Sequence, residues 1–102
     1  MSIHIISGAR QSGKTAALIG IAHTTGSYIV VRNQEAATQV FHRAIEMGLS
    51  INFPITWEEL RRGQYHGQGV KSFAIDDLDQ FVQYIAGGPP VIAATLPELE
   101  DM

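Results

Sequence analysis

Apolar runs alternate with amphipathic segments along this chain, and this alternation predicts strands separated by helices. Ser2–Ser7 is typical of a buried strand, and Tyr28–Val31 is a short run rich in β-branched residues. Further apolar runs predict strands over Lys71–Ile75 and Val91–Thr95. Leu49–Pro54 is ambiguous between a loop and a short strand that ends at the proline. The pattern therefore predicts a sheet of four or five strands.

The segments between the first strands have the periodicity of helices. Lys14–Ala22 is a helix-favouring apolar run, and Gln34–Met47 places its apolar side chains at helical spacing. Gly48 follows directly and is a typical helix stop. Gly63–Gly69 has three glycines in seven residues, which predicts a flexible loop.

Two shorter helices are predicted from their capping residues. Thr56 and Glu59 form a T-x-x-E capping box, which favours a short helix through about Arg62. A last helix is expected over Gln80–Ala86, with Asp79 as its cap and two glycines at its end. Strands alternating with helices predict a mostly parallel sheet with helices on both faces, and a ligand site at the carboxyl ends of the strands.

Length and composition limit what this chain can be. Its 102 residues predict a single domain over 1–102, and 45% apolar with 17% charged residues is typical of a globular protein. No apolar stretch is long enough to span a bilayer, and no secretory signal is visible, so we expect a cytoplasmic protein without a membrane partner. The absence of cysteine excludes disulfides and thiolate metal sites.

The formal charge of −3 does not support a strongly basic nucleic-acid footprint. It does not exclude contact with DNA, because several basic residues could gather on one face. Solvated surface is the more ordinary role for such residues. They are Arg32, Arg43, Arg61, Arg62 and Lys71.

Residues 8–15 read GARQSGKT, a complete match to the phosphate-binding pattern G-x-x-x-x-G-K-[ST], between a predicted strand and a predicted helix. Backbone N–H groups of such a loop and of the following helix N-terminus donate to phosphate oxygens. The motif predicts binding of a nucleoside triphosphate, with ATP and Mg²⁺ as the expected cofactors. The residues expected to bind the nucleotide are Gly8, Ala9, Arg10, Gln11, Ser12, Gly13, Lys14, Thr15 and Ala16.

Two side chains of this loop have distinct predicted roles. The Lys14 ammonium would reach the β and γ phosphate oxygens as a point charge. The Thr15 hydroxyl would take one coordination position of the Mg²⁺ ion. Gly13 permits the close approach of the backbone to the phosphates.

A pair of carboxylates ends the apolar run Ser72–Asp77. Such a pair resembles a Walker B motif, in which Asp76 would contact Mg²⁺ directly or through bound water. Asp77 stands where many P-loop ATPases carry a glutamate that orients the attacking water, and it is one methylene shorter. Hydrolysis is therefore less well supported than binding. Asp77 and Asp79 could instead serve only to cap and begin the next helix.

Together these motifs resemble a minimal P-loop NTPase of the additional-strand class, over nearly the whole chain. The resemblance implies a three-layer α/β/α P-loop fold, and it implies that Thr95, at the end of a further strand, senses the γ phosphate. The loop and the ending IAATLP are also similar to those of viral terminase ATPases and small phage proteins, which implies that Arg10 contacts the γ phosphate. The catalytic residues expected on this basis are Lys14, Asp77, Arg10 and Thr95.

We expect an Mg-ATP-binding protein with weak or partner-stimulated hydrolysis, such as a phage accessory protein acting on DNA in the host cytoplasm. A homo-oligomer or a phage or host protein is the expected partner. Two alternatives stay open. One is a non-catalytic module whose interactions depend on nucleotide. The other is a small nucleoside or nucleotide kinase, for which Gly63–Gly69 is the one candidate lid and no acceptor pocket is evident.

Overall fold

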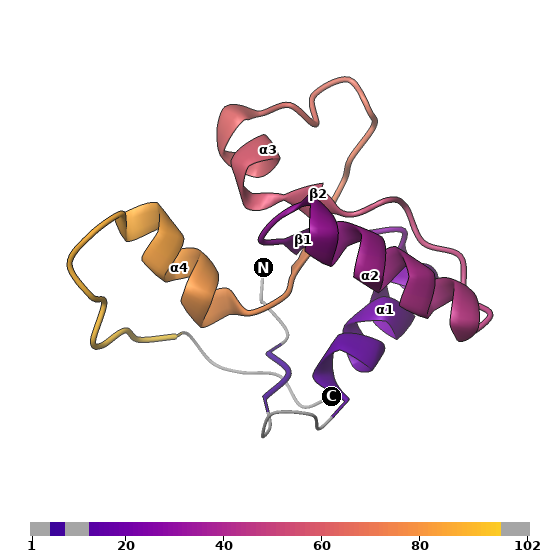
Figure 1. Ribbon diagram of the computed structural model, residues 1–102, viewed down its shortest axis with the longest axis horizontal. Helices are drawn as coiled ribbons and strands as arrows, with labels where there is room; N and C mark the ends of the chain where they lie inside the picture. Colours follow the sequence, from indigo (N-terminus) through magenta and orange to yellow (C-terminus); the bar gives the residue numbers. More distant parts are fainter. Residues whose placement is uncertain (1–4, 8–12, 97–102) are drawn as a thin grey trace.

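A three-stranded parallel sheet lies at the centre of the computed structural model, which describes residues 5–7 and 13–96 (Figure 1). The strands are β1 (Tyr28–Val31), β2 (Ile55–Thr56) and β3 (Phe73–Ile75), in the order β2-β1-β3. The helices are α1 (Lys14–Thr25), α2 (Gln34–Glu46), α3 (Trp57–Arg62) and α4 (Leu78–Ala86). The fold is therefore α/β with parallel strands, as predicted.

The central strand β1 joins the two ladders of the sheet. Val30 is paired with Ile55 of β2 on one side and with Ile75 of β3 on the other. Its side chain is fully buried, as is that of Ile29. A strand buried on both faces is expected to be a continuous β-branched run, which explains why the sequence predicted the bounds of β1 correctly.

Helices α1 and α2 pack side by side on one face of the sheet (Figure 1). Ile29 and Val31 point to this face because they are two residues apart on the strand. Alanines on both helices are buried against them, and their small side chains allow a close approach. The buried cluster consists of Ile19, Ala22, Ile29, Val31, Ala37, Val40, Ala44 and Ala74.

Helices α2 and α3 both begin with a side-chain cap. The Thr56 hydroxyl accepts from the Glu59 backbone N–H at 3.1 Å, and the Glu59 carboxylate accepts from the Thr56 N–H at 2.9 Å. This reciprocal pair is the predicted capping box of α3. Helix α2 begins at Asn33, whose side-chain oxygen accepts from the Ala36 N–H at 2.9 Å. Both helices therefore begin where the sequence indicates.

Helix α4 is placed differently from α1 and α2. It stands apart from them in Figure 1, and none of its residues is buried. Leu78, Val82 and Ile85 form an apolar stripe at helical spacing, yet they remain 38–54% exposed. Its packing partner is α3, through Trp57 with Phe81 and Tyr84. A complete second helical layer is therefore not present among the described residues.

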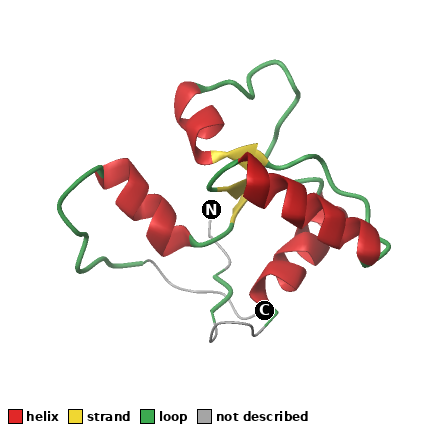
Figure 2. Cartoon of the chain, viewed as in Figure 1, coloured by secondary structure: helices red, strands yellow, loops and turns green. Residues whose placement is uncertain are grey.

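Two predicted strands differ from the structure. Ile5–Ser7, the described part of the first apolar run, has no regular secondary structure, and residues 2–4 lie outside the described part of the chain. Val91–Thr95 also forms no strand, and Figure 2 shows this segment as a loop. The Gln83 side chain accepts from the Val91 N–H at 2.8 Å and donates to the Pro89 carbonyl at 3.0 Å, which holds the start of the segment against α4.

None of the helices in the described ranges is long and apolar enough to cross a membrane.

Candidate functional site

The residues that follow the three strands meet at the carboxyl edge of the sheet. Arg32 follows β1, Trp57 follows β2 and Asp76 follows β3. Because the strands are parallel and Val31 is in register with Thr56, these three residues emerge on the same edge. This edge is where open α/β sheets bind their ligands.

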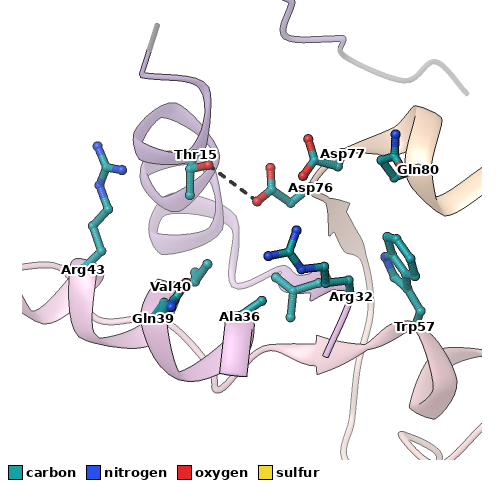
Figure 3. Close-up of a pocket in the computed structure, with 11 residues that line it drawn as sticks. Thr15, Arg32, Ala36, Gln39, Val40, Arg43, Trp57, Asp76, Asp77 and Gln80 are labelled. Atoms are coloured by element: carbon teal, nitrogen blue, oxygen red, sulfur yellow. Dashed lines mark hydrogen bonds between the residues drawn. The ribbon is translucent and has the colours of Figure 1, made fainter. Parts of the chain in front are cut away.

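The structure brings Thr15 to Asp76, although 61 residues separate them in sequence. The Thr15 hydroxyl donates to the Asp76 carboxylate over 3.5 Å, which is a long hydrogen bond (Figure 3). Thr15 lies in the first turn of α1, and the Asp76 backbone N–H donates to the Val30 carbonyl at 3.0 Å, which continues the β1–β3 ladder. The predicted Walker A hydroxyl and Walker B carboxylate therefore lie side by side.

Gly13 gives the chain its path into α1. It caps the helix with φ +85°, in the left-handed region that favours glycine. The Gly13 carbonyl accepts the first helical bond, from the Ala17 N–H at 3.0 Å. The predicted loop residues Gly8, Ala9, Arg10, Gln11 and Ser12 lie outside the described residues.

The Asp76 carboxyl is held in an unfavourable environment for a charge. Burial raises its pKa above the ordinary value, and the neighbouring charge of Asp77 raises this pKa further. The hydrogen bond from Thr15 and the charge of Lys14 act in the opposite direction. Carboxyls with raised pKa values in concave sites are candidates for a functional role.

Asp76→Asn is expected to raise the free energy of unfolding at neutral pH. A raised pKa in the folded state means that Asp76 contributes stability while it is protonated, and that this contribution is lost as pH rises through the folded pKa. The carboxyl is only partly buried, so we expect a gain of up to about 1 kcal/mol. Urea denaturation near pH 7 and near pH 4 measures it, and the gain should shrink at the lower pH.

A matched control for Asp76→Asn is Asp79→Asn. Asp79 is exposed in the first turn of α4, where its charge favours the helix, so its removal should not stabilise the protein. Destabilisation by Asp76→Asn at neutral pH would contradict the assignment of an electrostatic penalty to this carboxyl.

The backbone of Asp77 has an unusual, left-handed conformation. Among the described residues it is the one non-glycine with positive φ, at +56°, and it is the N-cap of α4. The Asp77 side chain makes no capping hydrogen bond. The predicted cap at Asp79 is wrong, because the helix begins earlier and Asp79 lies inside its first turn. A left-handed aspartate costs backbone free energy, and such outliers concentrate at functional sites. In Figure 3, Asp77 lies beside Asp76 at the rim of a cavity.

The cavity has a volume of about 280 Å³, which is near the lower end for small-molecule sites. It lies between the start of α1, the ends of the three strands and helix α2. Figure 3 shows Arg32 between Asp76 and Trp57, and Arg43 on the far side of Thr15. The cavity is lined by Thr15, Val31, Arg32, Ala36, Gln39, Val40, Arg43, Trp57, Asp76, Asp77 and Gln80.

The structure brings only some of the predicted site residues together. Thr15, Asp76 and Asp77 line the cavity, and Lys14 is close enough for its charge to act on the Asp76 carboxyl. Thr95 is exposed in the irregular segment after α4, outside the sheet and outside the cavity, so its sensor role stays a prediction without structural support.

Arg32, Arg43 and Trp57 are among the cavity residues that the sequence does not identify as site residues. The sequence gives Arg32 and Arg43 no role beyond that of solvated surface charges, and it gives Trp57 no role in the site. The signal for Arg32 is its position directly after the predicted strand Tyr28–Val31. Trp57 has no such signal, because the ambiguous segment Leu49–Pro54 ends before β2 begins. Arg43 carries no such signal, because its place depends on how α2 packs.

Thr15 and Asp76 offer only two oxygen ligands, which suits Mg²⁺ better than it suits a metal whose ligands all come from the protein. Hydroxyl and carboxylate oxygens suit a hard cation, and Mg²⁺ commonly keeps water and phosphate oxygens as its other ligands. Within residues 5–7 and 13–96 no group of three His, Asp or Glu side chains is placed to hold a metal ion. A tightly caged metal is therefore not indicated in this part of the chain.

Comparison of the chain with protein-family models, with curated proteins and with solved structures finds no match.

Proposed function

We propose that this chain binds Mg-ATP at the start of α1 and hydrolyses it weakly, or faster with a partner. The observation that carries the proposal is the contact between Thr15 and Asp76, 3.5 Å apart. The sequence motif GARQSGKT requires a carboxylate near its threonine if Mg²⁺ is to be held beside the phosphates, and the fold supplies one from a distant strand.

Different residues would bind the phosphates and the metal ion. Lys14 and the N–H groups at the start of α1 would hold the phosphates, while Thr15 and Asp76 would hold the metal. Bound Mg²⁺ would offset the negative charge that develops on the phosphoryl group. Its positive charge would also remove the electrostatic penalty of the Asp76 carboxylate, so nucleotide and metal should bind cooperatively.

Asp77 is the candidate for orienting the attacking water. It adjoins Asp76 and lines the same cavity, and its left-handed backbone fixes its position at the start of α4. The side chain is one methylene shorter than the glutamate of many ATPases, which supports slow turnover in the absence of a partner. A phage accessory role in DNA transactions is part of the proposal through the resemblance of the loop to terminase ATPases.

Calorimetric titration with ATP tests the metal part of the site. ATP should bind more tightly in Mg²⁺ than in EDTA, by about tenfold or more, since the ion bridges the phosphates to protein oxygens. Thr15→Ala should lose most of this difference, and Thr15→Ser, which keeps the hydroxyl, should retain it. Equal binding by all three proteins, or none, would contradict the proposal.

Phosphate release measured on the same samples separates turnover from binding. Release should be slow with the protein alone and should depend on Asp77. The assay is repeated with DNA, which detects stimulation by nucleic acid. The molecular mass in solution is measured on the same samples, which detects a homo-oligomer. Binding without release under any of these conditions would favour the non-catalytic, nucleotide-dependent interaction module.

A further inference from the structure

Helix α4 is apolar over more of its circumference than its packing within the chain uses. Trp57 packs against one side of the helix, through Phe81 and Tyr84. The next side carries the stripe of Leu78, Val82 and Ile85, which are 38–54% exposed. At 3.6 residues per turn the two sides together span an arc of about 200°, whereas a helix that covers one core needs an apolar arc of about 100°. A second packing partner for α4 is therefore indicated.

The stretches of this chain outside the described residues are poorly suited to be that partner. They are residues 1–4, 8–12 and 97–102, and none is longer than a few residues. Large apolar side chains in the first two stretches are limited to Met1 and Ile3. The last stretch carries Glu98, Glu100 and Asp101, and burying such charges against an apolar stripe is unfavourable. The partner is therefore best sought in a separate molecule.

The charge of this surface favours a second copy of the same chain. Asp79 is the one charged residue between Leu78 and Leu96 in the sequence. A nearly neutral surface does not repel its own copy, and the centres of interfaces between identical chains are apolar and poor in charge. A partner of opposite charge would find only one carboxylate to recognise here. The surface is thus complementary to itself.

An antiparallel pair of α4 helices fits the spacing of the stripe. With Val82 on the two-fold axis, Leu78 of one copy lies opposite Ile85 of the other, because both are about one turn from Val82. The Asp79 side chains of the two copies then lie on opposite sides of the axis, so their charges do not meet. A parallel pair would place them side by side. Charge therefore selects the antiparallel order.

The exposed apolar surface is large enough for such a dimer. Six large apolar side chains at and after α4 are about half exposed on average, and Gln83 holds the start of the segment after α4 against the helix. Since burial of a large aliphatic side chain removes roughly 100 Å² from water, they offer on the order of 400 Å². Homodimer interfaces are about 65% apolar, so this corresponds to about 600 Å² per copy, at the lower end for stable interfaces. The six are Leu78, Val82, Ile85, Val91, Ile92 and Leu96.

We propose that the chain forms a symmetric dimer in which Leu78, Val82 and Ile85 of α4 pack antiparallel against the same residues of a second copy. The contact uses no residue of the nucleotide site, so the dimer forms with or without nucleotide. The interface begins one residue after Asp77, and the dimer therefore holds the start of α4 in place at the rim of the cavity.

Sedimentation equilibrium over a wide range of protein concentration tests the dimer. The wild-type protein should show a monomer–dimer equilibrium in the micromolar range. Val82→Glu sets two like charges against each other on the two-fold axis and should raise the dissociation constant about hundredfold or more. Ile45→Glu is the matched control, because it adds the same charge at an isoleucine of α2 that is 60% exposed, and it should dimerise as the wild type does. Far-UV circular dichroism verifies that both variants are folded.

Single cysteines test the same contact without added charge, since the chain has no cysteine of its own. Packed helices lie 8–10 Å apart, so Val82→Cys brings two Cβ atoms on the axis near the separation that a disulfide spans. Mild oxidation should convert this variant to a covalent dimer and leave Ile45→Cys mostly monomeric. A mixture of Leu78→Cys and Ile85→Cys should form the mixed disulfide in preference to either symmetric one.

Three outcomes would overturn the inference. The first is a wild-type protein that stays monomeric at every concentration. The second is equal dissociation constants for Val82→Glu and Ile45→Glu, which would place any dimer contact elsewhere. The third is preferential linkage of Leu78→Cys to itself, which would exclude the antiparallel order. Each result is independent of the ATP titration, so failure of the dimer and failure of the nucleotide site are told apart.

Discussion

Lys14→Ala is expected to weaken the binding of Mg-ATP about ten- to hundredfold. A hydrogen bond to a charged group contributes about 1.5–3 kcal/mol, and each 1.4 kcal/mol corresponds to a factor of ten in affinity. Lys14 is the first residue of α1, next to Thr15, and its charge acts on the Asp76 carboxyl, so it is placed to reach phosphates bound there. Isothermal titration calorimetry in excess Mg²⁺ measures the change.

Lys71→Ala is the matched control for this experiment. Lys71 is exposed ahead of β3 and does not line the cavity, so its removal changes the net charge equally without touching the site. Its affinity for Mg-ATP should equal that of the wild-type protein. A Lys14→Ala variant that binds as tightly as Lys71→Ala would refute the assignment of the phosphate site to the start of α1.

Ile29→Ala is expected to have the largest effect on stability. Ile29 lies in the central strand and is 1% exposed, inside the cluster formed with α1 and α2. Truncation of a buried isoleucine to alanine costs about 2–5 kcal/mol, from lost burial and from the cavity that remains. A domain of this size has about 5–15 kcal/mol in total, so the variant should be strongly destabilised in urea denaturation.

Ile92→Ala provides the comparison. It removes the same atoms from a side chain that is 91% exposed, so the free energy of unfolding should change by less than about 0.5 kcal/mol. If Ile92→Ala destabilised the protein as much as Ile29→Ala, the segment after α4 would have to be packed rather than exposed.

Local sequence signals predicted the elements that the structure confirms. The β-branched run of β1, the capping box at Thr56 and the apolar period of α2 each act over a few residues, so they can be recognised without the fold. The bounds of β1 agree fully, and those of α2 differ by one residue. The parallel arrangement followed from the alternation of these elements.

The misjudged elements depend on contacts that the pattern cannot show. Val91–Thr95 has the composition of a strand, but a strand needs a neighbour to receive its hydrogen bonds, and Gln83 instead ties the preceding turn to α4. The same limit applies to the site. Thr15 and Asp76 were each recognisable from motifs, whereas the place of Arg43 in the cavity wall depends on the packing of α2 against the sheet.

The 61-residue separation of Thr15 and Asp76 has a consequence for folding. Residues 8–15 are contiguous in the sequence, but Asp76 reaches Thr15 only when β3 pairs with β1 in parallel, after a long loop has been closed. Non-local parallel pairing of this kind is slow compared with helix formation. The proposed metal-binding half of the site is therefore assembled at a late step, so a newly made chain should gain any affinity for Mg²⁺ together with its sheet and not with its first helix.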